Sequence, residues 1–222
     1  MNKLLQFFYL QCKVILRVPI ALFFSVVFPV LLLVMLIMTN GNPIIYYNVH
    51  FVDVYIPSLA LLTLLPTGLV SFSIDVSVNR SKKIWQTYTL KGLNLYHIIF
   101  SQFLAYILLA FISTLLAILV AKLFYGLIFP SFNDFLMFCL VWFLSAVVVF
   151  LIGFSIGCFL NNEKSTQQTS TMLMFLLMFL SGIFTNIHSF PLYVQNIVQY
   201  LPTTQIYYIL SDYWLVNNIF KV

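Results

Sequence analysis

Long apolar runs alternate with short polar loops along most of this chain of 222 residues. The runs cover residues 20–38, 54–74, 98–121, 135–160 and 168–187, and none of them contains Lys, Arg, Asp or Glu. A helix of about 20 residues, rising about 1.5 Å per residue, is long enough to cross the hydrocarbon core of a bilayer. The pattern therefore predicts an all-α polytopic membrane protein with five clear transmembrane helices.

The two ends of the chain differ from this pattern. Residues 1–18 mix Leu and Phe with basic residues, which is typical of an amphipathic helix lying in the membrane interface. Residues 188–222 are interrupted by proline and are rich in Tyr and Trp, which gather at the membrane–water boundary. We expect short interfacial or re-entrant helices there, on the extracellular side. Residues 1–222 would then form a single transmembrane domain.

Composition and charge narrow the class of protein. Hydrophobic residues make up 63% of the chain and charged residues only 7%, whereas a soluble domain carries about 25% charged residues, so a water-soluble fold is excluded. The net charge of +5 would suit a nucleic-acid partner, but the basic residues are concentrated in every second loop rather than spread over one surface. Eight of them precede the first run or lie in the second and fourth loops, and the alternate loops contain only Lys122. This bias places the N-terminus and residues 77–97 in the cytoplasm, and no nucleic acid is expected as a partner.

Catalytic and metal-binding motifs are missing from the sequence. It contains no HExxH, no GxSxG and no phosphate-binding GxxxxGK[ST]. His50, His97 and His188 lie in different loops, and the three cysteines lack the spacing of a metal site. Ionisable residues inside a membrane span normally mark a coupled carrier or an intramembrane enzyme, and no run contains one. We therefore expect no catalytic residue, metal or cofactor in this chain, and the energy for any uphill transport would come from a partner.

The loop of residues 77–97 is long for a turn between two spans. It combines basic residues with Trp85 and Tyr88, and Gly92 suits the end of a helix. A tryptophan among basic residues has the composition of a docking hot spot. The predicted docking site for an energy-supplying partner consists of Arg80, Lys82, Lys83, Ile84, Trp85, Tyr88 and Lys91. The alternative is a positive loop that sets the topology and carries an interfacial Trp.

Small residues one helical turn apart mark the fourth run. Gly153 and Gly157 form a GxxxG sequence, which lets a second helix backbone approach closely. Packing against a helix of the same subunit is favoured over a seam between two subunits.

Prolines and methionines mark the remaining runs of interest. Pro29 and Pro66 lie inside the first and second runs, where a proline removes a backbone hydrogen bond and favours a kink. The fifth run begins with polar residues and continues with Met172, Met174 and Met178. Methionine re-packs easily against changing neighbours, which suits a surface that meets varied substrates. Ordinary filling of a core explains the same residues equally well.

With these features the chain resembles the ABC-2 family, the membrane-spanning subunits of type V ABC exporters. The most specific similarity runs through residues 152–157 (IGFSIG), 161–164 (NNEK), 178–184 (MFLSGIF) and 200–204 (YLPTT). In the family this signature covers the fourth span, a short cytoplasmic turn, the fifth span and the outer helices. Residues 83–92 lie where the family has its cytoplasmic coupling helix, and the family has six spans.

The resemblance implies an exporter of the bacterial plasma membrane. Two such subunits, identical or different, would pair, and two cytoplasmic ATPase subunits would bind ATP and Mg and drive transport. The family lines its substrate path with the first, second and fifth spans, which here suggests Phe28, Pro29, Met35, Pro66, Met172, Phe175 and Met178. Because no run is charged, we expect an amphipathic or lipid-like substrate: a peptide, a drug or a lipid-linked glycan. The alternatives are a non-catalytic immunity or assembly protein and a small channel that acts alone.

Overall fold

The computed structural model describes residues 3–17, 22–46, 49–160, 162–184, 187 and 190–216. The regular elements of the described chain are helices, apart from one short pair of strands. In chain order the elements, with η marking a π-helix, are α1 (Lys3–Ile15), η1 (Phe23–Val27), α3 (Phe28–Asn40), β1 (Ile44–Tyr46), β2 (Val49–His50), α4 (Phe51–Leu65), η2 (Pro66–Ser71), α5 (Phe72–Ser81), α6 (Ile84–Leu90), α7 (Leu95–Tyr125), α8 (Phe132–Phe159), α9 (Glu163–Leu180), α10 (Leu192–Val198), α11 (Pro202–Ser211) and η4 (Asp212–Val216).

Three helices of the described chain are long and apolar enough to cross a membrane. They are Phe51–Ser81, which joins α4, η2 and α5, then Leu95–Tyr125 and Phe132–Phe159. These helices contain the second and third predicted spans and all but the last residue of the fourth, so three of the five apolar runs form helices of membrane length. The first predicted span contains a shorter apolar helix, Ser25–Thr39, and the fifth corresponds to α9, which begins with polar residues. The count of five spans therefore stays a prediction.

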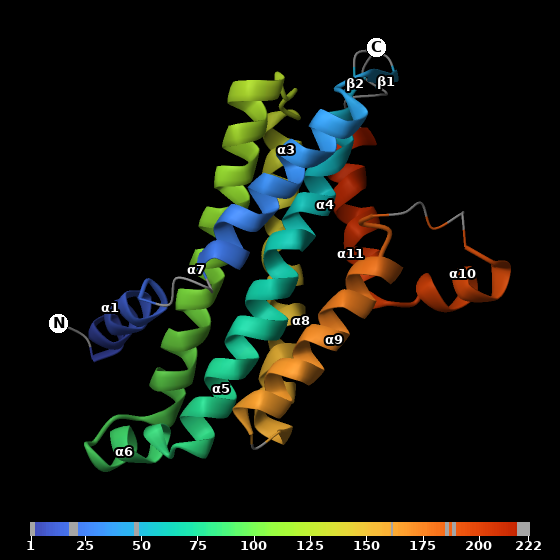
Figure 1. Ribbon diagram of the computed structural model, residues 1–222. Coiled ribbons are helices and arrows are strands. Elements are labelled where there is room, and N and C mark those ends of the chain that lie inside the picture. The colour runs from blue at the N-terminus through green and yellow to red at the C-terminus, as the bar shows by residue number, and fades with distance from the viewer. Residues whose placement is uncertain are drawn as a thin grey trace.

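The helix formed by α4, η2 and α5 lies at the centre of the bundle. Helices α3, α7, α8, α9 and α11 all pack against it (Figure 1), and nearly all its side chains between Ile56 and Leu69 are buried. A helix that is apolar all round suits such a position, since it has no face to leave in water. The bundle runs from an end that carries α6 to an end that carries β1 and β2 (Figure 1). We call these the α6 end and the hairpin end.

Side-chain hydrogen bonds close the hairpin end. Strands β1 and β2 pair antiparallel, a small exception to the all-α prediction. The Asp53 carboxylate accepts hydrogen bonds from the backbone N–H of His50 at 2.8 Å and from that of Ile128 at 2.9 Å. The Asn42 amide donates to the carbonyl of Tyr125 at 3.1 Å. These bonds fasten the start of α4 to the segment that follows α7.

Helix α1 lies across the outside of α7 (Figure 1). Its Phe7 and Ile15 are buried against the bundle, whereas Leu5, Tyr9 and Leu10 are exposed. The exposed apolar side chains leave a face that suits a lipid surface, and the interfacial position of this helix stays a prediction. Of the predicted segment 1–18, the first two residues and the last lie outside the described residues.

The C-terminal segment is divided between a projecting helix and a packed one. Helix α10 projects away from the bundle, whereas α11 and η4 run along α4 and α8 (Figure 1). Trp214 in η4 is fully buried, with its ring centroid 4.9 Å from that of Phe138. The interfacial or re-entrant form expected for 188–222 stays a prediction. Residues 188, 189 and 217–222 lie outside the described chain.

Candidate functional site

At the α6 end the chain reverses direction between two long helices. Lys83 adopts a left-handed backbone conformation (φ 56°) just before α6 starts at Ile84. Gly92, at φ 79°, follows the end of α6 and allows the chain to turn towards α7, and glycine adopts this conformation without steric cost. The predicted coupling segment therefore contains a helix of seven residues, Ile84–Leu90, held between the ends of α5 and α7.

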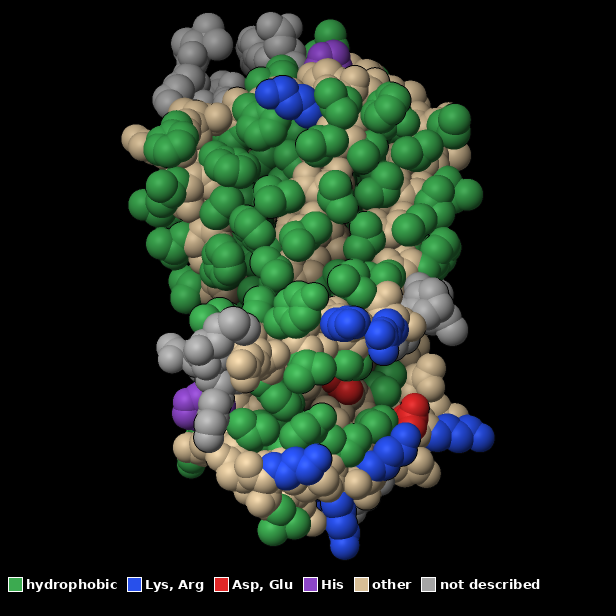
Figure 2. Space-filling view, turned by 90° about the vertical axis from the view of Figure 1, so that its left-hand side faces the viewer, with side chains coloured by type: hydrophobic (Ala, Val, Ile, Leu, Met, Phe, Trp, Pro, Cys, Tyr) green, Lys and Arg blue, Asp and Glu red, His purple; other side chains and the backbone are tan. Residues whose placement is uncertain are grey.

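Basic side chains surround α6. Arg80, Lys82, Lys83 and Lys91 are all exposed, and Figure 2 shows Lys and Arg side chains gathered towards this end, below a broad hydrophobic surface. Among the described residues one ion pair occurs, between Lys82 and Glu163, at 4.0 Å and open to solvent. Such a surface pair contributes little to stability. The positive charges are therefore accessible to an acidic partner.

The aromatic residues of this segment face the protein itself. Trp85 is partly buried against the core, and the Tyr88 ring packs edge-on against Phe7 of α1, with centroids 5.1 Å apart. Ile84 is also partly buried. The prominent exposed hydrophobic residue of α6 is Leu90, which is 89% exposed. The exposed residues of α6 are thus Gln86, Thr87, Thr89 and Leu90, with the basic residues on both flanks of the helix and the aromatic rings partly buried on its other side.

The residues of the predicted substrate path fall into buried and exposed sets. Pro29, Pro66 and Met178 are buried and Phe28 is partly buried, whereas the exposed members are Met35, Met172 and Phe175. Helix α3 packs on α4, while α9 packs mainly on η2 and α5. The path residues of α3 and those of α9 therefore lie beside different parts of the central helix.

Both prolines of the predicted path adjoin π-helical turns. Pro29 is the second residue of α3, just after η1, and Pro66 is the first residue of η2. A π-helical turn interrupts the regular hydrogen-bond ladder of an α-helix and is a common place for a helix to bend. The irregularity expected from a mid-span proline takes this form here.

Gly153 and Gly157 lie where α8 crosses the central helix. A Cβ atom at Gly153 would collide with the backbone carbonyl of Gly68, and one at Gly157 would lie 2.5 Å from the carbonyl oxygen of Ser73. Both approaches are to backbone of the same chain. Close backbone contact of this kind requires a residue without a side chain.

Hydroxyl groups join α9 to α5. The Oγ atoms of Ser73 and Ser170 lie 2.7 Å apart, and the Thr166 hydroxyl donates to the Oγ of Ser77 at 3.0 Å. Ser77 in turn donates to the carbonyl of Leu160 at 3.1 Å. All four hydroxyl side chains are buried. The polar start of α9 is thus explained in part by contacts inside the subunit.

A polar cluster lies inside the bundle on the α6 side of η2. The Asp75 carboxylate accepts a hydrogen bond from the Gln102 amide at 2.6 Å and is also hydrogen-bonded to the side chain of Tyr106. Gln102 is fully buried, and its Oε1 has no partner among the described residues. The expectation of charge-free spans is wrong here, because the central helix continues past residue 74.

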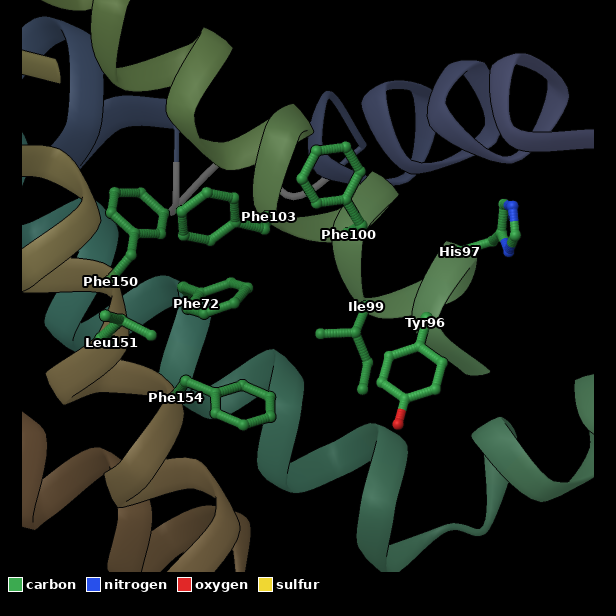
Figure 3. Close-up of a pocket in the computed structure, with 9 residues that line it drawn as sticks. All are labelled: Phe72, Tyr96, His97, Ile99, Phe100, Phe103, Phe150, Leu151 and Phe154. Carbon is green, nitrogen blue, oxygen red and sulfur yellow. The ribbon is translucent and has the colours of Figure 1, made fainter. Parts of the chain in front are cut away.

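An aromatic groove of about 650 Å³ opens between α5, α7 and α8 (Figure 3). Its aromatic lining consists of Phe72, Tyr96, Phe100, Phe103, Phe150 and Phe154. Among the described residues, no Lys, Arg, Asp or Glu contributes to the lining. Phe72 connects the groove to the polar cluster, because its ring centroid lies 5.2 Å from that of Phe150 and 5.5 Å from that of Tyr106.

Residues 36–220 match the family described as ABC-2 family transporter protein. The chain belongs to the ABC-2 family. The match includes the three membrane-length helices, α6 and the aromatic groove, and it leaves α1 outside. No curated protein matches this ABC-2 permease, and no solved structure does. Membership makes the chain the membrane component of an ABC transporter, a family whose ATPase resides in a partner subunit.

Proposed function

We propose that this ABC-2 permease is the membrane subunit of an ATP-driven exporter and that the ATPase docks on α6. The observation that carries the proposal is α6 itself, a short helix between the ends of two membrane-length helices, with Leu90 and the basic residues exposed. Only residues 82–83 and 91–94 join α6 to α5 and α7. A shift of the docked ATPase would therefore be transmitted to both helices at once.

The distribution of charge supports the orientation of the permease in the membrane. Arg80, Lys82, Lys83 and Lys91 lie at the α6 end, while Lys122 lies near the hairpin end. Cytoplasmic loops carry the excess of Lys and Arg in multi-span proteins. We infer that α6 and the N-terminus face the cytoplasm of a bacterial plasma membrane. The partner ATPase would bind ATP and Mg on that side.

The apolar character of the predicted path supports an amphipathic or lipid-like substrate. Its exposed members, Met35, Met172 and Phe175, are hydrophobic, and a second copy of the chain or a related subunit would cover them. A drug, an amphipathic peptide or a lipid-linked glycan would each present an apolar part to such a path. Pro29 and Pro66, beside their π-helical turns, would let the path change shape.

One experiment tests both the docking of the ATPase on α6 and the direction of transport. The permease is co-expressed with its cognate ABC ATPase, and ATP-dependent accumulation of a fluorescent lipophilic dye is measured in inside-out vesicles. Leu90→Ala removes an exposed hydrophobic side chain that we place in the interface, where a hot-spot residue contributes about 2 kcal/mol or more. Co-purification of the ATPase and dye accumulation should both fall at least tenfold.

Leu123→Ala is the matched control, because Leu123 is an exposed leucine at the opposite end of α7. It should leave both measurements unchanged. If Leu90→Ala behaves like this control, the ATPase docks elsewhere. If the dye accumulates only in right-side-out vesicles, the permease imports and the proposed direction is wrong.

A further inference from the structure

We propose that Asp75 is a positioning residue for ATP-driven transport. Through its hydrogen bonds to Gln102 and Tyr106 it makes α5 and α7 move together when α6 is shifted. This role rests on the proposed docking of the ATPase on α6. It adds the step that carries the movement of α6 along both helices towards the membrane, which the docking site alone does not provide.

The Asp75–Gln102 hydrogen bond joins the two helices that flank α6, at matching positions along them. Asp75 lies six residues before α5 ends at Ser81, and Gln102 lies seven residues after α7 begins at Leu95. At a rise of about 1.5 Å per residue, each is roughly 10 Å from the connection to α6. The Gln102 amide donates to the Asp75 carboxyl group at 2.6 Å. The two helices are thus joined by α6 at their ends and by this hydrogen bond further along.

Other contacts between α5 and α7 are sparse in the described chain. Helix α5 packs closely on α8 and α9, whereas its backbone comes near that of α7 at few points. The aromatic groove opens between α5, α7 and α8 (Figure 3). The Phe72 ring contacts those of Phe103 and Tyr106, with centroids 6.2 and 5.5 Å away, but apolar contacts have no direction and let helices slide. A hydrogen bond weakens steeply when it is bent, so it fixes the alignment of the two helices.

Burial makes this hydrogen bond hard to break. Gln102 is fully buried and Tyr106 is 7% exposed, so water competes little for their polar groups. No described residue forms an ion pair with Asp75, so Gln102 and Tyr106 are the groups that hold its carboxyl group. Separation of the helices would leave the Gln102 amide buried without a partner, which costs free energy. The two helices therefore stay aligned when α6 is displaced.

The second oxygen of the cluster allows the hydrogen bond to be separated from the charge of Asp75. The Oε1 atom of Gln102 is buried and has no partner among the described residues. An asparagine at position 75 would keep one oxygen that accepts hydrogen bonds and would add an NH₂ group that can donate to this Oε1. The link between α5 and α7 should therefore survive Asp75→Asn, whereas Asp75→Leu removes it.

The test uses the full-length permease with its cognate ATPase in inside-out vesicles. Dye accumulation and ATP hydrolysis are measured together, and their ratio gives the dye transported per ATP consumed. Loss of folded protein alone lowers both quantities and leaves the ratio unchanged. Asp75→Leu should lower the ratio at least fivefold, and Asp75→Asn should keep it within twofold of the unaltered chain.

Ser170→Ala is the matched control. The Ser170 hydroxyl forms a buried hydrogen bond with Ser73, which joins α5 to α9 instead of α7. Its loss should leave the ratio unchanged. Gln102→Leu breaks the hydrogen bond to Asp75 from the side of α7 and should reproduce the effect of Asp75→Leu, so the test stands even if Asp75→Leu does not fold.

A distance measurement tests the link without transport. Spin labels on cysteines replacing Ser81 and Tyr96, in a background without other cysteines, lie at the end of α5 and at the start of α7, and both positions are exposed. Double electron–electron resonance should give a narrow distance distribution that trapped ATP leaves unchanged, in the unaltered background and with Asp75→Asn. Asp75→Leu should broaden the distribution.

The outcomes separate this role of Asp75 from the docking of the ATPase. If Leu90→Ala leaves the ATPase bound, docking on α6 is wrong, and the coupling through Asp75 fails with it even where the spin labels show the link. An unchanged ratio and distance distribution in Asp75→Leu would overturn the link and leave the docking standing. Equal losses in Asp75→Asn and Asp75→Leu would mean that the charge of Asp75 matters and not its hydrogen bonds. An equal loss in Ser170→Ala would show a general effect of weakened packing.

Discussion

At the scale of single residues, Gly153 and Gly157 have the sharpest structural requirement. Each has backbone of the central helix where a Cβ atom would lie. We predict that Gly153→Leu and Gly157→Leu each destabilise the fold, by at least the cost of about 1–3 kcal/mol that overpacking a core carries. The apparent unfolding temperature in detergent should fall in both variants. Ser155→Leu, an exposed site between the two glycines, is the control, and equal melting of all three variants would contradict the prediction.

The GxxxG spacing and the polar cluster show what residue patterns reveal and what they miss. The spacing of Gly153 and Gly157 pointed to a close helix contact, because it depends only on sequence distance along one helix. The contact of Asp75 with Gln102 joins residues that are far apart in the chain. No local pattern specifies such a pairing, so it becomes visible only when α5 and α7 are packed together.

At the scale of elements, the contact between α1 and α6 links two segments that the sequence treats separately. Phe7 of α1 meets Tyr88 of α6 edge-on, and aromatic pairs of this kind contribute about 0.5–1.5 kcal/mol beyond their burial. We predict that Phe7→Ala and Tyr88→Ala each speed amide hydrogen exchange in α1 several-fold, measured by mass spectrometry. The double variant should be less than additive, since both changes remove one contact.

Tyr9→Ala provides the control for this contact, because Tyr9 lies on the exposed side of α1. Its exchange rates should match those of the unaltered chain. If Phe7→Ala and Tyr88→Ala also leave the exchange of α1 unchanged, α1 is held by α7 alone and does not sense α6.

The sequence did not show which side of α6 faces away from the protein. Trp85 and Tyr88 were expected to face a partner, and both are partly buried, Trp85 against the core and Tyr88 against Phe7 of α1. A helix of seven residues has too few turns for its apolar face to be recognised by periodicity. The tertiary contact with α1 decides which side of α6 is outward, and it leaves Leu90 exposed.

At the scale of the whole molecule, the apolar runs predicted the three long helices well because membrane length is a strong constraint on sequence. The ends of these helices were predicted less well, since α5 continues through polar residues to Ser81. The first and last predicted spans match shorter or partly polar helices, α3 and α9. These two helices carry the exposed residues of the predicted substrate path. Their exposure in the single chain suggests that another subunit covers them in the assembled transporter.

The proposed contact of α3 and α9 with a second subunit leads to a prediction for the assembled transporter. Met35 is 64% and Met172 is 72% exposed, whereas Met178 is 2% exposed. Cysteines replacing Met35 or Met172, in a background lacking Cys12, Cys139 and Cys158, should form cross-linked dimers on oxidation, detected by gel electrophoresis. A cysteine at Met178 should not, because its side chain is enclosed within one subunit. Trapping ATP on the partner ATPase should change the yield at Met35 and Met172, since the two subunits then move relative to each other.

Leu144→Cys in the same background tests whether this cross-linking is specific. Leu144 is an exposed residue of α8, outside the predicted path, and random collisions in the membrane would cross-link it as readily as Met35. A higher yield at Met35 and Met172 than at Leu144, together with dependence on ATP, would mean that α3 and α9 meet a second subunit. Equal yields without any effect of ATP would mean that these helices face lipid and that the substrate passes elsewhere.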